Sequence, residues 1–573
     1  MRRKLLALSL VFNVLLLASV GLLEHRVLMH DARVFWHDLM GTSGTPSVVV
    51  PMATGEILIV VDPSADVHDI SPYIYGVAKR DPGAVAGLDA TINRWGGNPS
   101  SRYNWVIGHA WNAASDWEFR NLNYSDQGGS ESDRFVSGDR SGGMASIITI
   151  PATGWVARSD KNSDQSLNVP GDGGPAISSD GAVAGYDPAA NRQRTSVPSL
   201  PRKNAPFVLN PDSGSAAVYQ DEWVNHLRTL FGSAGAGGVG FYAIDNEPML
   251  WSQTHRDVHP ARVGYDELAR TYLQYAAAVK SVDPTAQLLG PESCCWTDYW
   301  DSELDRGTDN FATQPDRNAH GGMPLIPWFL DAARQHDAAT GTRSLDVLTV
   351  HFYPEARGVA TDTSNPDIDA LRMRATRALW DPTYVDESWI KQPVNLIPRL
   401  KSWVAAEYPG TRVGITEYNM GGGDSPSAGL AEAEALGIFG REGVYIATYW
   451  TAPKPGSPAW FAFRMYRNAD GKQGTFGSQS VRATSSASDT VSVFASKGSG
   501  YVDLILINKD LQAAHNLTVG LGKVSAVGPV QRFQYSDANS SAIVRLADTS
   551  ASASLTLEVP RASITLLRVP VAH

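Results

Sequence analysis

The sequence contains very little cysteine: two residues in 573, at the adjacent positions 294 and 295. Two cysteines are too few for a disulfide-stabilised scaffold. We expect Cys294 and Cys295 to be two small, partly buried side chains rather than metal ligands. An excess of positive charge is also missing, because Lys and Arg total 48 against 59 Asp and Glu. This acidic balance, without a long basic run, argues against nucleic acid as a partner.

Long hydrophobic runs are rare, and the clearest one lies at the N-terminus. Residues 5–23 are apolar except for three polar side chains, and positive charges in Met1–Lys4 precede them. As a helix, this run would reach roughly 28 Å, close to the thickness of a bilayer. We therefore predict that residues 1–23 are an export signal, either cleaved or kept as a membrane anchor, followed by a linker over 24–55. The rest of the chain is then expected outside the cytoplasm, either secreted, periplasmic or anchored to the membrane.

The remaining composition is that of a folded protein. Hydrophobic residues make up 43% of the chain and charged residues 19%, which excludes an intrinsically disordered protein. Length alone is compatible with three or four domains, or with one large barrel and a β module.

Between residues 73 and 465, apolar runs of strand length alternate with helical patterns. The candidate strands are 73–77, 90–95, 145–150, 240–244, 287–289, 345–351, 412–416 and 444–450. The candidate helices are 216–231, 265–282, 326–336, 396–407 and 428–439. Eight strands with intervening helices predict an α/β fold, a (β/α)8 TIM barrel, rather than an open sheet. The Gly- and Ser-rich stretch 155–205 is expected to wall a cleft on its C-terminal face.

The segments that flank this barrel are predicted to form β structure. After residue 466, short strand patterns return about every ten residues, which predicts a β-sandwich over 466–573. Residues 56–72 contain one further strand, at 57–61.

Two glutamates follow candidate barrel strands, at the end where barrel enzymes place their catalytic groups. Glu247 follows the fourth strand and Glu417 the seventh. Two carboxyl groups that face each other across a barrel mouth suit glycoside hydrolysis. One gives a proton to the departing oxygen, and the other meets the positive charge that develops at the anomeric carbon. The alternative is that each glutamate caps a helix or joins a surface ion pair.

Two other motifs carry little weight. Residues 235–240 match G-x-G-x-x-G, but they precede a strand, whereas a dinucleotide site joins a strand to a helix. His255 and His259 have the spacing of a zinc helix, yet Arg256 replaces the expected glutamate and Pro260 follows. We expect ordinary loop packing there and predict no catalytic metal.

Tryptophan is abundant, with 16 residues, the same number as phenylalanine. Indole rings are good platforms for sugar faces. Several lie beside polar residues near predicted strand ends: Trp95, Trp105, Trp117, Trp251, Trp380, Trp389 and Trp450. Core packing is the commoner role for any one of them, but together they favour a long saccharide groove.

Seven short segments follow one another in a recognisable order: Arg94-Trp95-Gly96-Gly97-Asn98, Tyr103-Asn104-Trp105, Asp116-Trp117, Asp245-Asn246-Glu247-Pro248, Leu250-Trp251-Ser252, His351-Phe352-Tyr353-Pro354-Glu355 and Thr416-Glu417-Tyr418-Asn419. This ordered set resembles glycoside hydrolase family 44, the endoglucanases and xyloglucanases among the retaining barrel glycosidases. Asn-Glu-Pro alone is common to that larger clan.

The resemblance implies roles for individual residues. Glu247 would be the general acid/base and Glu417 the nucleophile. Asn246 would bind the sugar 2-hydroxyl, while Arg94 and Tyr353 would lie near the nucleophile. Asn98 and His351, in the same segments, join the candidate substrate-binding set. The resemblance also implies that the strand at 57–61 completes the C-terminal sandwich.

We therefore predict a monomeric, retaining endo-β-1,4-glucanase that acts on cellulose-type glucans or xyloglucan. The alternatives are a xylanase or mannanase on the same barrel, or a tethered carbohydrate-binding protein without catalysis. No cofactor is required, because neither proton transfer nor glycosyl transfer to a carboxylate is a redox step. A structural cation bound by residues 362–369 is an alternative, although a solvated loop is favoured there. A membrane would be a partner only through an uncleaved leader.

Overall fold

The computed structural model describes residues 56–572, except 80, 86, 125–128, 166–185, 188–191, 194, 523–525 and 551–553. The predicted leader and linker therefore lie outside the described residues, as does much of the predicted loop at 155–205. Within the described part, none of the helices is long and apolar enough to cross a membrane.

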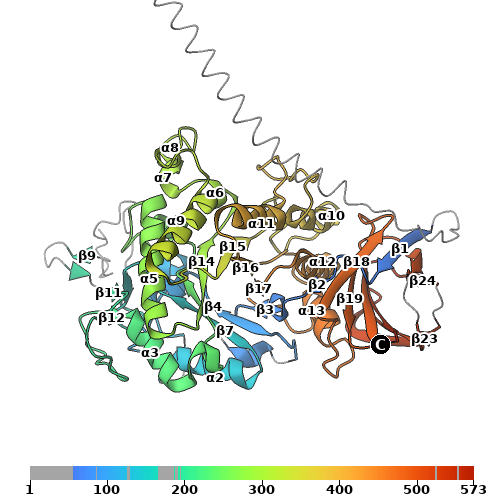
Figure 1. Cartoon of the computed structure of the whole chain (residues 1–573), viewed down its shortest axis with the longest axis horizontal. Coiled ribbons are helices and arrows are strands. Elements are labelled where there is room, and N and C mark those ends of the chain that lie inside the picture. The colour runs from blue at the N-terminus through green and yellow to red at the C-terminus, as the bar shows by residue number, and fades with distance from the viewer. Residues whose placement is uncertain are drawn as a thin grey trace, which may run out of the picture. The chain divides into compact units, whose positions relative to one another are not determined.

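Eight parallel strands close into a barrel (Figure 1). In chain order they are β3 (Gly76–Val77), β4 (Ile92–Trp95), β7 (Ala145–Ile150), β13 (Phe241–Ile244), β14 (Gln287–Ser293), β15 (Val347–Phe352), β16 (Arg412–Tyr418) and β17 (Ile446–Tyr449). Each overlaps one predicted strand, so the predicted barrel is confirmed. Buried apolar side chains from neighbouring strands pack together, including Ile92, Phe241, Leu289 and Val347.

Helices cover the barrel between successive strands. The longer ones are α2 (Glu131–Ser141), α3 (Gln220–Phe231), α5 (Tyr265–Val282), α9 (Leu325–Thr340), α10 (Pro366–Ala375), α11 (Leu396–Glu407), α12 (Pro426–Glu442) and α13 (Pro458–Arg467). The bounds of α5 and α11 agree with the prediction, whereas α2, α10 and α13 were not predicted. All three begin at a capping side chain: Ser130, Asn365 and Ser457 each accept a hydrogen bond from a backbone N–H of the first turn.

The second part is a ten-stranded sheet that folds around its own apolar core. Its strands are β1 (Ile57–Asp62), β2 (His68–Asp69), β18 (Gln479–Ser485), β19 (Val491–Gly498), β20 (Tyr501–Asn508), β21 (His515–Gly520), β22 (Val530–Ser536), β23 (Asn539–Thr549), β24 (Ser554–Val559) and β25 (Ser563–Pro570). Strand β1 lies between β18 and β21, antiparallel to the first and parallel to the second. The N-terminal strand thus completes the sandwich, as expected.

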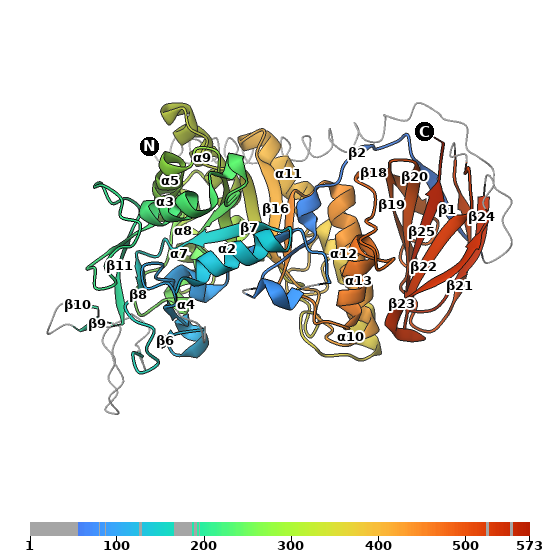
Figure 2. The ribbon, with the colours of Figure 1, turned by 90° about the horizontal axis from the view of Figure 1, so that it is seen from below.

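Alternate side chains of this sheet enter two different cores. Val491 and Val493 of β19 belong to the sandwich core, whereas Phe494 joins the core that includes the barrel helices. Gly437 of α12 makes room for that ring, because a Cβ atom there would lie 2.3 Å from it. Figure 2 shows α12 and α13 between the barrel and the sandwich. One face of the sheet therefore packs on the barrel helices, while its other face encloses the separate core of the sandwich.

Candidate active site

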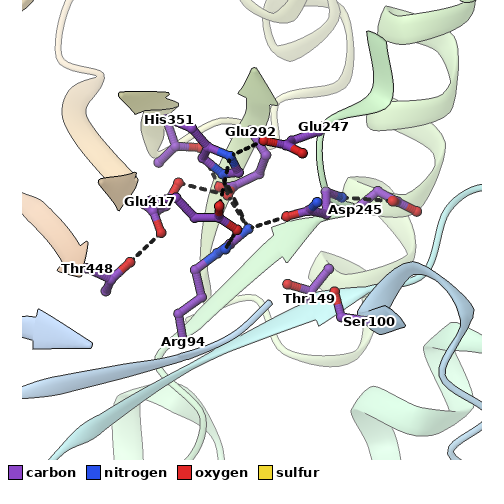
Figure 3. A network of polar contacts seen from close by, with 12 residues as sticks. Arg94, Ser100, Thr149, Asp245, Glu247, Glu292, His351, Glu417 and Thr448 are labelled. Atoms are coloured by element: carbon purple, nitrogen blue, oxygen red, sulfur yellow. Dashed lines mark hydrogen bonds and ion pairs between the residues drawn. The ribbon is translucent and has the colours of Figure 1, made fainter. Parts of the chain in front are cut away.

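Arg94 is the centre of the polar network at the C-terminal end of the barrel (Figure 3). It lies on β4 and is fully buried. Its Nη1 donates to Glu417 Oε1 at 2.6 Å, and its Nη2 donates to Asn246 Oδ1 at 2.8 Å. Nη2 also donates to Glu292 Oε2 at 2.9 Å. One guanidinium thus ties together groups from three other barrel strands or the turns that follow them.

Glu247 follows β13 by three residues, and the turn between them is anchored by Asp245. The buried Asp245 carboxylate accepts hydrogen bonds from Ser101 Oγ and from the backbone N–H groups of Ala152 and Thr153. The Trp251 indole N–H also donates to it. The Glu247 side chain keeps 16% of its surface exposed, so it can be reached from solvent.

Glu417 lies at the end of β16, with each carboxylate oxygen held by a different donor. Arg94 binds Oε1, and the Tyr353 hydroxyl donates to Oε2 at 2.9 Å. Burial and the neighbouring charge of Glu417 raise the pKa of Tyr353, so this hydroxyl keeps its proton. Both contacts fix the orientation of the Glu417 carboxylate.

His351, on β15, connects the two glutamates. Its Nδ1 lies 2.8 Å from Glu247 Oε1 and 3.6 Å from Glu417 Oε2. One oxygen of each carboxyl group and one nitrogen of His351 lie within 4.8 Å of one another. The predicted pair, far apart in sequence, therefore meets at one point. Arg94 and His351 are buried, and each contacts one or both of the glutamates.

Glu292 is a third carboxylate in the network, and the sequence analysis missed it. It lies on β14, fully buried, and accepts hydrogen bonds from Thr349 Oγ1 at 2.6 Å and Thr416 Oγ1 at 2.7 Å. The predicted strand ended at residue 289, whereas β14 continues to Ser293. A strand extended by four residues would have revealed an acidic residue at a barrel strand end.

Three of the predicted substrate-binding tryptophans are core residues instead. Trp95, Trp105 and Trp251 are only 4%, 4% and 3% exposed. Trp95 packs against three aromatic rings, while the indole N–H of Trp105 donates to the Tyr219 carbonyl. The fold covers most of the surface of these three rings, although Trp95 also borders a groove together with Trp450.

The remaining candidates lie at the surface or on a groove. Trp117 and Trp389 are 48% and 59% exposed. Trp450 is half-buried and, with Arg94, lines a groove of about 1370 Å3, larger than an ordinary small-ligand pocket. Asn98 donates to Asp116, another residue of this groove, and accepts from Asn246 Nδ2 at 3.3 Å.

Among the described residues, two sets of three side chains have the spacing of metal ligands: Glu247, His351 and Glu417, and Cys294, Cys295 and Asp298. The first set belongs to the network above. In the second, the two cysteines form a disulfide between neighbouring residues, a pairing that the sequence analysis did not foresee. Only part of the predicted loop 362–369 is a loop, because α10 begins at Pro366; Asp369, in the first turn of α10, pairs with Arg372 at 2.8 Å. His259 pairs with Glu267 at 2.9 Å, and His255 is buried.

Comparisons with known proteins agree on one family. The model of glycoside hydrolase family 44 matches residues 110–356. Endoglucanase A of Paenibacillus lautus is 33% identical over 522 residues, which cover 85% of this chain and 69% of that protein. A β-mannanase/endoglucanase A of Caldicellulosiruptor saccharolyticus is 30% identical over 543 residues, 88% of this chain and 38% of that protein.

Solved structures extend this likeness over the barrel and the sandwich. A bifunctional glucanase-xylanase from a metagenome library has a TM-score of 0.80 and 36% identity, covering 90% of this chain and 99% of that one. A family 44 xyloglucanase of Paenibacillus polymyxa, solved with xyloglucan, has a TM-score of 0.80 and 32% identity, covering 90% and 100%. With the barrel, the paired glutamates and these relatives, the chain belongs to glycoside hydrolase family 44.

Proposed function

We propose that this protein is a retaining endo-β-1,4-glucanase that hydrolyses cellulose-type glucans and xyloglucan. Glu247 is the general acid/base and Glu417 the nucleophile. The observation that carries the proposal is the approach of one oxygen of each carboxyl group to within 4.8 Å. Retaining glycosidases hold these groups about 5–5.5 Å apart, whereas inverting enzymes need roughly 6.5–9.5 Å to admit a water.

The first step transfers the sugar to the enzyme. The ionised Glu417 carboxylate attacks the anomeric carbon, while Glu247 protonates the glycosidic oxygen as the carbon–oxygen bond breaks. The proton leaves with the departing chain end, and a glycosyl ester forms on Glu417. Arg94 and Tyr353 support this step because they orient the attacking carboxylate.

The second step releases the sugar. Glu247, now ionised, takes a proton from water, and the oxygen of that water attacks the anomeric carbon. The bond to Glu417 breaks, and the carboxylate returns to Arg94 and Tyr353. Asn246 supports both steps: its Oδ1 accepts from Arg94, which orients the Nδ2 group for the sugar 2-hydroxyl.

Indole rings at the surface and on the groove would bind the polysaccharide. Trp117 and Trp389 are exposed, and Trp450 lines the groove beside Arg94. Arg120 lies 4.6 Å from the centre of the Trp117 ring, and the Trp389 N–H donates to Glu355. Such contacts fix the rings, which suits stacking against sugar faces.

The simplest test of the proposed chemistry is the variant Glu417→Gln. This variant keeps the size of the side chain but removes the nucleophile, so turnover should fall below detection while oligosaccharide binding and the melting temperature stay near those of the wild type. Undiminished hydrolysis by the purified variant would refute the assignment.

Substrate choice needs a separate test, because relatives differ. One relative is named a β-mannanase/endoglucanase and another a glucanase-xylanase. Initial rates on xyloglucan, carboxymethylcellulose, xylan and glucomannan should be highest on the first two. A xylan or glucomannan rate that exceeds both would favour the alternative activities, and binding without product would favour a non-catalytic protein.

We further propose that the enzyme acts outside the cytoplasm as a monomer and needs no cofactor. Export rests on the apolar leader at 1–23. N-terminal sequencing of the protein recovered from fractionated cells would show whether the leader is cleaved or retained. If no metal cofactor is needed, the enzyme should keep full activity after dialysis against a chelator.

A further inference from the structure

The Glu292 carboxylate is held in its charged form although it is completely buried. Burial raises its pKa, but the charge of Arg94 and hydrogen bonds from His351 and Thr349 outweigh burial and lower the pKa to about 2. An ionised carboxylate can only accept hydrogen bonds. Its Oε2 lies 3.3 Å from His351 Nε2, so Nε2 carries a hydrogen.

This fixed hydrogen decides what the other nitrogen of His351 can do. In a neutral imidazole one nitrogen donates and the other accepts. With Nε2 as the donor to Glu292, Nδ1 faces Glu247 Oε1 at 2.8 Å, free to accept a proton from that carboxyl or to return it. The Nδ1 and Oε1 atoms are thus close enough to pass one proton between them.

We propose that Glu292 is a positioning residue for the acid/base: through His351 it keeps one proton on the pair formed by the His351 imidazole and the Glu247 carboxyl group. This inference rests on the proposed function, in which Glu247 must be protonated before it can assist the departure of the leaving group. The Glu292 side chain has no exposed surface and contacts Nε2 of His351, so it acts through that ring.

Charge supports this role. Burial lowers the pKa of His351, but the charge of Glu417 and hydrogen bonds to Glu247 and Glu292 raise it to about 9. Without Glu292, the buried site would hold two cationic groups, Arg94 and His351, beside Glu417, and the positive charge would expel the shared proton more readily. The carboxylate of Glu292 offsets one of them.

Other ionisable groups also face the pair formed by His351 and Glu247. Glu417 and Arg94 face the ring of His351, with Arg94 Nη2 3.4 Å from Nε2. Besides burial, the charge of Glu247 or Glu292 raises the pKa values of four neighbouring groups: Asp116, Tyr272, Asp298 and Tyr353. The Glu292 variant leaves all of these residues chemically unchanged, so we assign a shift that follows the substitution to Glu292.

The test is the pH dependence of kcat/KM for Glu292→Gln. The amide is uncharged and can place an N–H group toward Nε2, so the shared proton should leave at lower pH. We expect the alkaline limb of the profile to move down by about one pH unit or more. The matched control is Thr349→Val, which removes a hydrogen bond from Glu292 but keeps the charge; its alkaline limb should stay at the wild-type position.

A second readout separates proton supply from general damage. Aryl β-cellobiosides with a dinitrophenol leaving group need little acid assistance, whereas phenyl cellobioside needs much. Glu292→Gln should lose at least about ten-fold more activity on the phenyl substrate. Equal losses on both substrates, or an unmoved alkaline limb, would overturn the inference. If Glu292→Gln does not fold, Glu292→Asp should show a smaller shift in the same direction, and no shift there would also overturn it.

The two proposals fail in different ways. A wild-type enzyme that cleaves no β-1,4-glucan defeats the proposed function. An active wild type whose alkaline limb is insensitive to Glu292 defeats only this inference.

Discussion

At the residue scale, the site holds several backbone conformations that L-residues rarely adopt. Asp245, Glu247 and Glu292 have φ angles of 62°, 45° and 58°. Such left-handed conformations cost about 1–3 kcal/mol each and persist where the surroundings fix them. Here the hydrogen bonds of Asp245 and the network around Arg94 fix these conformations. As a result, Glu247 and Glu292 both reach the ring of His351.

Tyr353 provides a direct test of how Glu417 is held. Tyr353→Phe removes only the hydroxyl that donates to Glu417 Oε2 at 2.9 Å. Loss of one charge-assisted hydrogen bond is worth about 1.5–3 kcal/mol, so kcat should fall by about 10- to 100-fold with little change in stability. Tyr445→Phe is the control, since its hydroxyl contacts Gln287 at the opposite end of the barrel strands. Equal activity of the wild type and Tyr353→Phe would contradict the role.

The sequence predicted residues of this site unevenly, for physical reasons. Glu247 and Glu417 could be found because a charged residue after an apolar strand is a local signal. Glu292 could not, because Gly290 and Pro291 interrupt the strand pattern before it. The burial of Trp95 could not be predicted either, since it depends on rings brought together by the fold.

At the element scale, the two glycines after β4 leave space for the catalytic groups. A Cβ atom on Gly96 would lie 2.3 Å from the guanidinium of Arg94, and one on Gly97 would lie 2.5 Å from the ring of Trp450. Both distances are below van der Waals contact. The glycines therefore allow Arg94 and Trp450 to lie against the strand end.

Gly96→Ala should displace the Arg94 guanidinium and so weaken its contact with Glu417. We expect at least a ten-fold loss of kcat/KM, measured on the best substrate of the panel. Gly240→Ala is a matched control, because its Cβ would meet no atom within 4 Å and its φ is ordinary. We expect near wild-type activity for the control, and a Gly96→Ala enzyme as active as the control would contradict this role of Gly96.

Helix α12 carries a buried carboxyl group, Glu432, that links stability to pH. Burial raises the pKa of Glu432 to about 8, although a hydrogen bond from Tyr418 lowers it. The folded state thus binds a proton that the unfolded chain releases near its ordinary pKa of 4.5. The stabilisation is complete below that value and is lost as pH rises through about 8.

Glu432→Gln should remove this dependence. Between pH 5 and 9, the free energy of unfolding of the wild type should fall relative to that of the variant by at least about 1 kcal/mol. Denaturant unfolding at several pH values measures the difference. Parallel curves for the two proteins would show that Glu432 does not titrate in this way.

The sequence predicted elements best where the pattern was long. The 18-residue α5 and the 12-residue α11 were predicted to the residue. Helix α13 was missed because aromatic and basic residues obscure its period. Its packing on α12 stabilises a helix that the local sequence pattern does not reveal.

At the scale of the whole molecule, the barrel and the sandwich should unfold together. Phe494 of β19 packs against Gly437 of α12, and the core containing both the barrel helices and Phe494 is continuous. Calorimetry on residues 56–573 should show one transition. Phe494→Ala should lower the free energy of unfolding by about 3–5 kcal/mol and leave a single transition. Two separate transitions in the wild type would contradict the shared core.

The central claim is that Glu247 and Glu417 act on one glycosidic bond in two displacements. The most direct measurement is proton NMR of the anomeric signals during the first minutes of hydrolysis of a β-1,4-glucan. Two displacements predict that the new reducing end appears first as the β-anomer and only later equilibrates. Initial appearance of the α-anomer would require a single displacement and would contradict the account.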